Sequence, residues 1–190
     1  MNRFFVSVLS FLVFTISSFA EGFYDLKPNE KYNNESLSLN YMPFHNNKTQ
    51  IYCDENGSSI WKIIYNNSTR ERYVKIGEKF MRANVEEKYG TLNNFFVLYN
   101  PDLTHNYDTY WPLDAKIGDN WNGKILYFNV KATLCEFGDM VFDNKKVQYA
   151  KIIFFDKKRN IEGYGVFGKN IGLIEFHIGY KYLRLVPPND

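Results

Sequence analysis

The sequence predicts a mainly β fold: an antiparallel meander that forms a sandwich or an open barrel, with at most one short helix. The chain of 190 residues contains 15 Tyr and 17 Phe, residue types that favour strands. Its short apolar runs recur about every ten residues and are separated by turns rich in Gly, Asn and Lys, which is typical of antiparallel sandwiches and barrels.

In the first half of the chain, residues 36–42 alternate Leu37, Leu39 and Tyr41 with other residues, the period of two expected of a half-buried strand. Residues 79–90 are the competing helix candidate, but their apolar residues form no stripe of helical period, so a strand followed by a loop is favoured. The other predicted strands are 59–65, 72–76, 94–99, 140–142, 147–155, 161–167, 171–178, 181–186, and 123–137, which is a long strand or a bent pair.

Residues 168–170, Gly-Lys-Asn, separate two apolar runs near the end of the chain. Gly and Asn tolerate positive φ and both flanking runs are strand-like, so the stretch is interpreted as a hairpin turn in which Gly168 and Gly172 are structural. A glycine-rich phosphate loop would need a helix after it, and residues 171–178 do not predict one.

The first 20 residues predict a cleaved signal peptide. Arg3 precedes a short apolar run, and small residues indicate cleavage after Ala20. The run is shorter than the roughly 20 residues of a membrane-spanning helix, which is the alternative. We therefore expect a secreted or periplasmic protein in which residues 21–190 form a single β domain, with residues 21–35 as an extended N-terminal arm and no membrane span.

The formal net charge of +2 lacks the strong positive balance expected of a protein with a nucleic-acid partner. One basic cluster, Lys157-Lys158-Arg159, lies between two predicted strands. It is interpreted as a solvated turn, because such positions are normally surface loops.

The chain contains two cysteines, Cys53 and Cys135. In an oxidising compartment an even pair predicts a disulfide, and two buried free thiols are the alternative. The two Cys and three dispersed His show no metal-site spacing, so neither a metal nor another cofactor is expected.

The sequence shows no catalytic set, so we expect that the protein is not an enzyme. It has no Gly-x-Ser-x-Gly elbow, and a Cys53–Cys135 bridge would leave no thiol nucleophile. Glu175 and His177 share one face of a predicted strand and are interpreted as a surface charge pair rather than an acid and a base.

Residues 100–111 predict a long polar and aromatic loop, and Tyr107, Tyr110 and Trp111 are the binding candidates in it. Their rings can stack on sugars or fill a partner's pocket. The alternative is a connector whose aromatic residues fold inward.

Three segments follow one another in a recognisable order: YWPLDAKIGDNW (110–121), CEFGDMVF (135–142) and GYGVFGKNIGLIEF (163–176). This order resembles a widespread group of uncharacterised bacterial exported β-domains with the pattern Y-P-L-x-V-G-x-x-W, followed later by G-V-G-L-V. The matching positions are Tyr110, Pro112, Leu113, Ile117, Gly118, Trp121, Gly138, Phe142, Tyr164, Gly168, Ile171, Gly172, Leu173 and Ile174.

The resemblance covers the C-terminal half only, and it departs from the pattern at Ala115-Lys116, Cys135 and Phe137. It implies an exported β fold but no activity. The first motif also has a physical interpretation: Pro112 and Gly118 predict turns, and Trp121 predicts a core anchor at one end of the sheet.

A second, local similarity surrounds Cys53. The stretch IYCDENGSSIWKIIY (51–65) is similar to the Cys-containing hairpin of membrane-bound C-type lysozyme inhibitors, small periplasmic proteins that block an active-site cleft with a loop. The later half of that family's pattern, with its closing Cys, is not recognisable here, so the similarity implies nothing beyond the hairpin.

Together these observations predict a monomeric, non-enzymatic exported β-domain that binds an unknown protein or cell-envelope component, in its sharper form a periplasmic inhibitor or immunity-type protein. Two alternatives stay open. A hydrolase of peptidoglycan or another polysaccharide needs two carboxylates that face each other across a cleft. A carrier of a hydrophobic ligand needs an unfilled apolar cavity.

Overall fold

The computed structural model describes residues 24–42, 48–66, 69–83, 87–99, 107–125 and 128–188. The predicted signal peptide and residues 100–106 of the predicted loop lie outside these ranges. Within them the chain forms fourteen strands and two short 3-10 helices, η1 (Glu30–Tyr32) and η2 (Leu39–Tyr41). The strands are β1 (Lys27–Pro28), β2 (Lys48–Cys53), β3 (Ser59–Asn66), β4 (Thr69–Ile76), β5 (Lys79–Arg82), β6 (Glu87–Leu92), β7 (Phe95–Tyr99), β8 (Tyr107–Pro112), β9 (Asn120–Ile125), β10 (Phe128–Phe142), β11 (Lys145–Asp156), β12 (Ile161–Gly168), β13 (Gly172–Ile178) and β14 (Lys181–Leu185).

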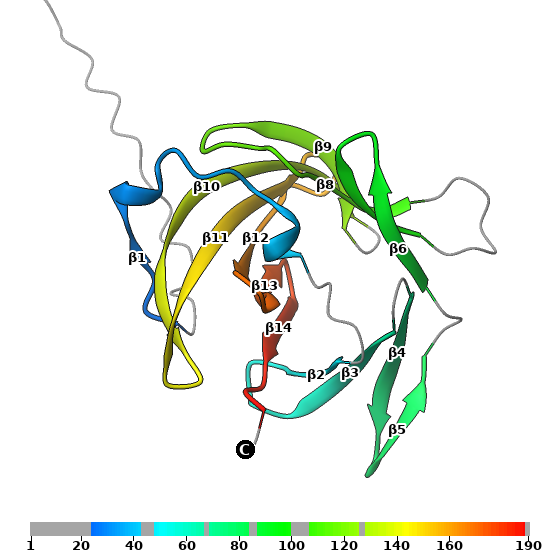
Figure 1. Ribbon diagram of the computed structural model, residues 1–190. Coiled ribbons are helices and arrows are strands. Elements are labelled where there is room, and N and C mark those ends of the chain that lie inside the picture. The colour runs from blue at the N-terminus through cyan, green and yellow to red at the C-terminus, as the bar shows by residue number, and fades with distance from the viewer. Residues whose placement is uncertain are drawn as a thin grey trace, which may run out of the picture.

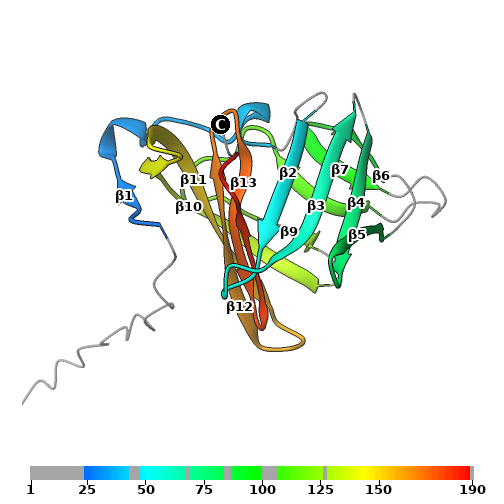
Figure 2. The same cartoon turned by 90° about the horizontal axis from the view of Figure 1, so that it is seen from below.

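All these strands belong to one antiparallel sheet, so the predicted mainly β fold is confirmed. The strand order is β1-β10-β11-β12-β13-β14-β2-β3-β4-β6-β7-β8, with β5 paired to β4 and β9 paired to β10. Two runs of consecutive hairpins, β10 to β14 and β2 to β4, are joined where β14 pairs with β2 (Figure 2). In the described part of the chain the sheet is not closed into a barrel.

The sheet curls until its two ends lie close together. Figure 1 shows β8 and β9 next to each other, and the ring centroids of Trp111 on β8 and Trp121 on β9 are 6.0 Å apart. Trp121 is partly buried there. None of the helices in the described part of the chain has the length and apolar content needed to cross a membrane.

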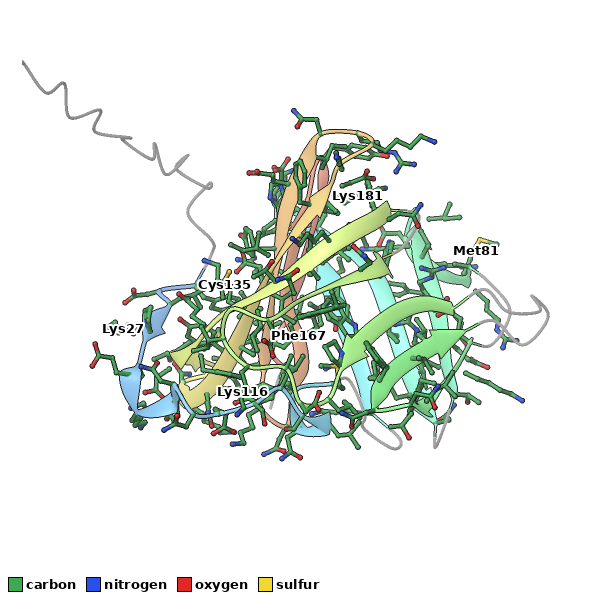
Figure 3. The ribbon with its side chains drawn as sticks, turned by 90° about the horizontal axis from the view of Figure 1, so that it is seen from above. Lys27, Met81, Lys116, Cys135, Phe167 and Lys181 are labelled. Carbon is green, nitrogen blue, oxygen red and sulfur yellow. The ribbon has the colours of Figure 1, made fainter. Side chains whose placement is uncertain are left out.

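The main core lies on the inner face of the curled sheet. Strand β11 places Ala150, Ile152 and Phe154 on this face, and all three are fully buried. The ring of Trp111 packs against both Phe154, at 5.6 Å between centroids, and Phe167 on β12, at 5.1 Å. Figure 3 shows Phe167 near the middle of the molecule, whereas Lys27 and Met81 lie at its two ends.

The turn at residues 168–171 is the hairpin that the sequence predicts. It joins β12 to β13, and Asn170 and Gly172 have φ of 64° and 90°, the left-handed values that these residue types tolerate. The basic cluster 157–159 is likewise an exposed turn, between β11 and β12. The Asp156 carboxylate accepts the backbone N–H groups of Lys158 and Arg159.

Residues 36–42 do not form the predicted strand. Leu37 and Tyr41 are buried, but Leu39 is 43% exposed, and the segment ends in the 3-10 helix η2. The backbone N–H groups of Tyr41 and Met42 donate to the carbonyls of Ser38 and Leu39. The carbonyl of Asn40 accepts a hydrogen bond from the backbone N–H of Asn170. The segment therefore packs against the β12–β13 turn instead of adding to the sheet.

Two further segments differ from the prediction. Residues 79–90 contain strand β5 and the start of strand β6, so their second part is not only a loop and the helix alternative is wrong. Residues 107–111 of the predicted loop belong to strand β8, which pairs with β7. Residues 123–137, predicted as a long strand or a bent pair, belong to the antiparallel strands β9 and β10.

The N-terminal arm is docked rather than simply extended. Strand β1 pairs with the edge of β10, with Lys27 opposite Asp139. The Asn29 amide and the Tyr32 hydroxyl donate to the two oxygens of the Asp139 carboxylate at 2.7 Å and 3.0 Å. This carboxylate is therefore the anchor of the arm.

The predicted disulfide is wrong: Cys53 and Cys135 are both free thiols. Cys53 lies on β2 and Cys135 on β10, and four strands separate them in the sheet. Five strand-to-strand steps of about 4.8 Å amount to about 24 Å along the sheet, whereas bridged cysteines need Cα atoms within about 7 Å.

Candidate functional site

A cavity of about 480 Å³ lies between the β10–β11 hairpin, the start of β2 and the chain after β14. Figure 1 shows the β10–β11 hairpin near the C-terminal end of β14. Its lining comes from the start of β2, the β10–β11 hairpin, the turn before β13 and the chain after β14. The lining residues are Lys48, Thr49, Gln50, Ile51, Phe142, Asp143, Lys145, Val147, Ile171, Leu185, Val186, Pro187 and Pro188. The volume lies within the roughly 300–1,000 Å³ of small-molecule sites, and most of the lining is apolar.

One wall of the cavity depends on the β10–β11 turn. Asp143 and Asn144 have φ of 52° and 54°, so both central residues are left-handed, as a tight type I′ hairpin turn requires. This turn pairs Phe142 with Lys145 and Met140 with Val147. Because paired residues share a face, Phe142, Lys145 and Val147 lie on the same side of the hairpin.

The opposite wall is the C-terminal segment. The backbone N–H of Val186 donates to the carbonyl of Ile51 at 2.8 Å, which extends the β14–β2 ladder by one residue. Pro187 and Pro188 have no N–H and cannot continue a ladder. They leave an apolar surface without backbone donors beside the cavity.

Gln50 is the one buried polar side chain among the lining residues, with 3% exposure. Its Nε2 donates to the carbonyl of Ile171 at 2.9 Å, and its Oε1 accepts from the Tyr52 hydroxyl at 3.0 Å. Both ends of the amide are therefore engaged by the protein. The bonds tie β2 to the turn before β13 and keep this part of the cavity in place.

The charged lining residues are Lys48, Lys145 and Asp143, two ammonium groups against one carboxylate. Lys145 Nζ lies 3.8 Å from Asp143 Oδ2, and the Lys145 side chain is 76% exposed. Lys48, at the start of β2, is also exposed. The charges therefore lie at the solvent side of a largely apolar cavity.

Tyr24 connects the two walls. Its hydroxyl donates to the carbonyl of Leu185 at 3.4 Å, and its ring centroid is 5.9 Å from that of Phe142. Burial raises the pKa of Tyr24 to about 12, so its hydroxyl keeps its proton at neutral pH. The N-terminal arm thus crosses beside the cavity and holds one of its edges.

A second candidate is the polar cluster around Glu175 on β13. The Glu175 side chain has no solvent exposure, and its Oε1 accepts from the hydroxyl of Tyr164 at 2.6 Å and of Tyr182 at 3.4 Å. Burial, together with the Glu175 carboxylate, raises the pKa of Tyr164. The ring of His177 lies 5.8 Å from the Tyr164 ring and 6.2 Å from the Tyr182 ring.

Glu175 and His177 share a face, as predicted, but not as a surface charge pair. Because the carboxylate is fully enclosed, no substrate can touch it in this conformation. On the adjoining strands, the guanidinium Nε of Arg184 donates to Cys53 Sγ at 3.4 Å. The cluster stabilises the outer face of β12–β14, and among the described residues no three His, Cys, Asp or Glu side chains are grouped to hold a metal ion.

The predicted binding residues lie on β8 rather than in a loop. The side chains of Tyr107 and Tyr110 lie outside the described part of the structure, and Trp111 is a core residue with 5% exposure. Of the predicted structural residues, Pro112 ends β8, and Gly118, at φ 93°, donates its N–H to Leu134. None of the cavity residues was predicted as a site, because each belongs to a locally unremarkable strand end or turn.

Comparison of the chain with protein-family models, curated proteins and solved structures finds no match in any of the three. The fold and the cavity together define an antiparallel β protein with an apolar cavity at one end of a curled sheet.

Proposed function

We propose that the protein is a non-enzymatic binding protein that takes the apolar part of a cell-envelope component into the cavity between β2, the β10–β11 hairpin and the C-terminal segment. The observation that carries the proposal is the cavity itself: about 480 Å³, with Phe142, Val147, Ile171 and Leu185 in its lining. Apolar surface of this kind favours an apolar ligand, because burial removes the ligand's own surface from water.

The proposal also uses the expected export of the chain. An exported protein meets envelope molecules that carry acyl chains, and such chains need shelter from water outside the bilayer. The apolar side chains of Phe142, Val147, Ile171 and Leu185 in the cavity lining support this shelter for an acyl chain. The Gln50 amide, the buried polar group in the lining, is already bonded to Ile171 and Tyr52.

The hydrolase alternative receives less support. Hydrolysis of a glycosidic bond uses two carboxyl groups on either side of the bond. Of the described residues that line the cavity, Asp143 is the sole carboxylate. The geometry therefore favours binding over hydrolysis.

The test is binding of N-phenyl-1-naphthylamine, a neutral apolar fluorophore that brightens when it leaves water. We expect the wild-type protein to bind it and Val147→Trp, which fills the cavity, to lose binding. Val141→Trp is the matched control, because Val141 lies on the same hairpin, is 65% exposed and does not line the cavity. Circular dichroism checks that both variants fold, and equal binding by all three proteins contradicts the proposal.

A further inference from the structure

The charges at the cavity indicate which kind of ligand it selects. Lys48 comes from the start of β2 and Lys145 from the start of β11, so two separate elements each bring an ammonium group to the lining. Asp143 is the one acidic lining residue among those described. Two positive charges against one negative leave a net formal charge of +1.

The two lysines differ in how they are engaged. The Asp143 carboxylate sits in the hairpin turn, 3.8 Å from Lys145 Nζ, and only 23% of the Asp143 side chain is exposed. The negative charge of Asp143 therefore partly offsets the positive charge of Lys145. Among the described residues nothing forms an ion pair with Lys48, so its ammonium group can meet a ligand.

Apart from the three charged residues, the described lining of the cavity has two polar side chains, Thr49 and Gln50. The Gln50 amide is buried, donates to the Ile171 carbonyl and accepts from the Tyr52 hydroxyl, so the protein already engages both of its ends. Pro187 and Pro188 present no backbone donor. A ligand's polar end is therefore best placed at the lysines, with its apolar end inside, because an unbonded polar group inside the cavity would lose its hydration.

We propose that the cavity selects an anionic amphiphile, an alkyl chain with one negatively charged head group, with the chain against Phe142 and Val147 and the head group at Lys48 and Lys145. The inference rests on the proposed function, since the alkyl chain must enter the same cavity. Charge complementarity adds selectivity for the head group to the apolar binding.

The test compares three ligands with the same twelve-carbon chain: dodecanoate, dodecanol and dodecylammonium. Displacement of N-phenyl-1-naphthylamine from the wild-type protein is measured at pH 8 and low salt, with the two ionic ligands below their micelle concentrations and dodecanol below its solubility limit. We expect dodecanoate to bind most tightly and dodecylammonium least tightly. Exposed ion pairs contribute up to about fivefold each in affinity, so the preference over dodecanol should be about tenfold and should shrink as salt is added.

The double variant Lys48→Gln/Lys145→Gln should lose this preference while its affinity for dodecanol stays the same. Lys157→Gln/Lys158→Gln is the matched control, because these lysines lie in the turn beyond the far end of β11, a strand of 12 residues that spans about 40 Å. If dodecanol binds as tightly as dodecanoate to the wild-type protein, the inference is wrong and the apolar cavity stands. If none of the three displaces the fluorophore, the proposed function is wrong and the inference falls with it.

Discussion

Strands β12 and β4 belong to the same antiparallel sheet, yet their residues are buried to different extents. Six consecutive residues of β12, Gly163–Gly168, are buried. In β4 the first six residues are half-buried and the last two are exposed. The difference separates the C-terminal hairpins from the N-terminal ones, although both are paired by the same kind of ladder.

The burial of β12 on both faces explains how the C-terminal region is held. Its inner face packs on the aromatic core around Phe154, and its outer face carries Tyr164, which bonds the enclosed Glu175. On β4 itself, charged side chains make specific contacts with neighbouring strands. Arg70 Nε lies 2.6 Å from Glu87 Oε2, and the guanidinium of Arg72 lies over the Trp61 ring. Packing on both faces therefore holds β12, whereas at β4 charged contacts are added to the aromatic packing of the strands beside it, where the ring centroids of Tyr65 and Tyr89 are 6.2 Å apart.

The largest expected effect is in the C-terminal region. Phe154→Ala should lower the free energy of unfolding by about 4 kcal/mol, because a fully buried ring is removed from contact with Trp111 and Phe176. Met81→Ala on β5, where the side chain is 56% exposed, should cost less than about 0.5 kcal/mol. Urea denaturation measures both, and equal costs would remove the distinction between the regions.

The N-terminal region should respond most to loss of a charge. Glu87→Gln should cost about 3 kcal/mol, because it leaves the Arg70 guanidinium, 16% exposed, without its carboxylate. Glu71→Gln is the control: Glu71 pairs with the 48% exposed Arg82, and its loss should cost below about 1 kcal/mol. Both are measured by urea denaturation, and a cost for Glu87→Gln no larger than for Glu71→Gln would show that this ion pair does not hold β6 to β4.

Glycines give a direct comparison of packing in the two regions. A Cβ at Gly163 on β12 would lie 2.2 Å from the backbone oxygen of His177, which cannot move aside cheaply, so Gly163→Ala should cost about 2 kcal/mol. A Cβ at Gly90 on β6 meets nothing within 4 Å, so Gly90→Ala should be neutral or slightly stabilising. Thermal unfolding followed by circular dichroism distinguishes the two, and a stable Gly163→Ala would mean that β12 and β13 can separate.

Local patterns predicted much of this sheet. The apolar runs at 147–155, 161–167 and 171–178 became β11, β12 and β13, and the Gly-Lys-Asn turn between the last two lies where positive φ is needed. Both signals depend on residues close together in the sequence. For that reason the folded protein shows the strands and the turn that these signals predict.

The failures come from contacts that distant residues make. Leu37 and Tyr41 alternate as in a strand, but the segment has no strand to pair with and packs against the β12–β13 turn instead. Trp111 lies in a polar tract, yet β12 and β11 supply the rings that bury it. The even number of cysteines predicted a disulfide, but it could not indicate that four strands lie between Cys53 and Cys135 in the sheet.

The cavity could not be predicted for the same reason. The cavity is lined by residues far apart in the sequence, among them Lys48, Phe142 and Pro187. Lys48 begins β2, Phe142 ends β10 and Pro187 follows β14, and these are ordinary positions for such residues. Lys48 and Pro187 come together because β14 pairs with β2, the pairing that joins the C-terminal hairpins to the N-terminal ones. Neither the hydrophobic periodicity of the sequence nor its turn residues indicate that β14 pairs with β2.

The smallest effect tests the polar contact that ties the N-terminal arm to β10. Burial of the Asp139 carboxyl opposes its ionisation, but hydrogen bonds from Asn29, Tyr32 and Lys146 outweigh it and lower the pKa of Asp139. The carboxylate therefore stabilises the fold above the unfolded pKa of about 3.9, and this contribution is lost as the pH falls through the lower folded pKa. Asp139→Asn should cost about 1.5 kcal/mol at pH 7 and progressively less below about pH 4.

Urea denaturation of the wild type and of Asp139→Asn between pH 2 and pH 8 measures this difference. The range extends below the ordinary pKa of an Asp carboxyl because the pKa of Asp139 is lowered in the folded protein. Tyr32→Phe, which removes one of the donors, should keep part of the pH dependence. A stability difference that stays constant across the range would show that the charge on Asp139 does not hold the arm. The arm would then depend on the β1–β10 ladder and on the contacts of Tyr24 with Leu185 and Phe142.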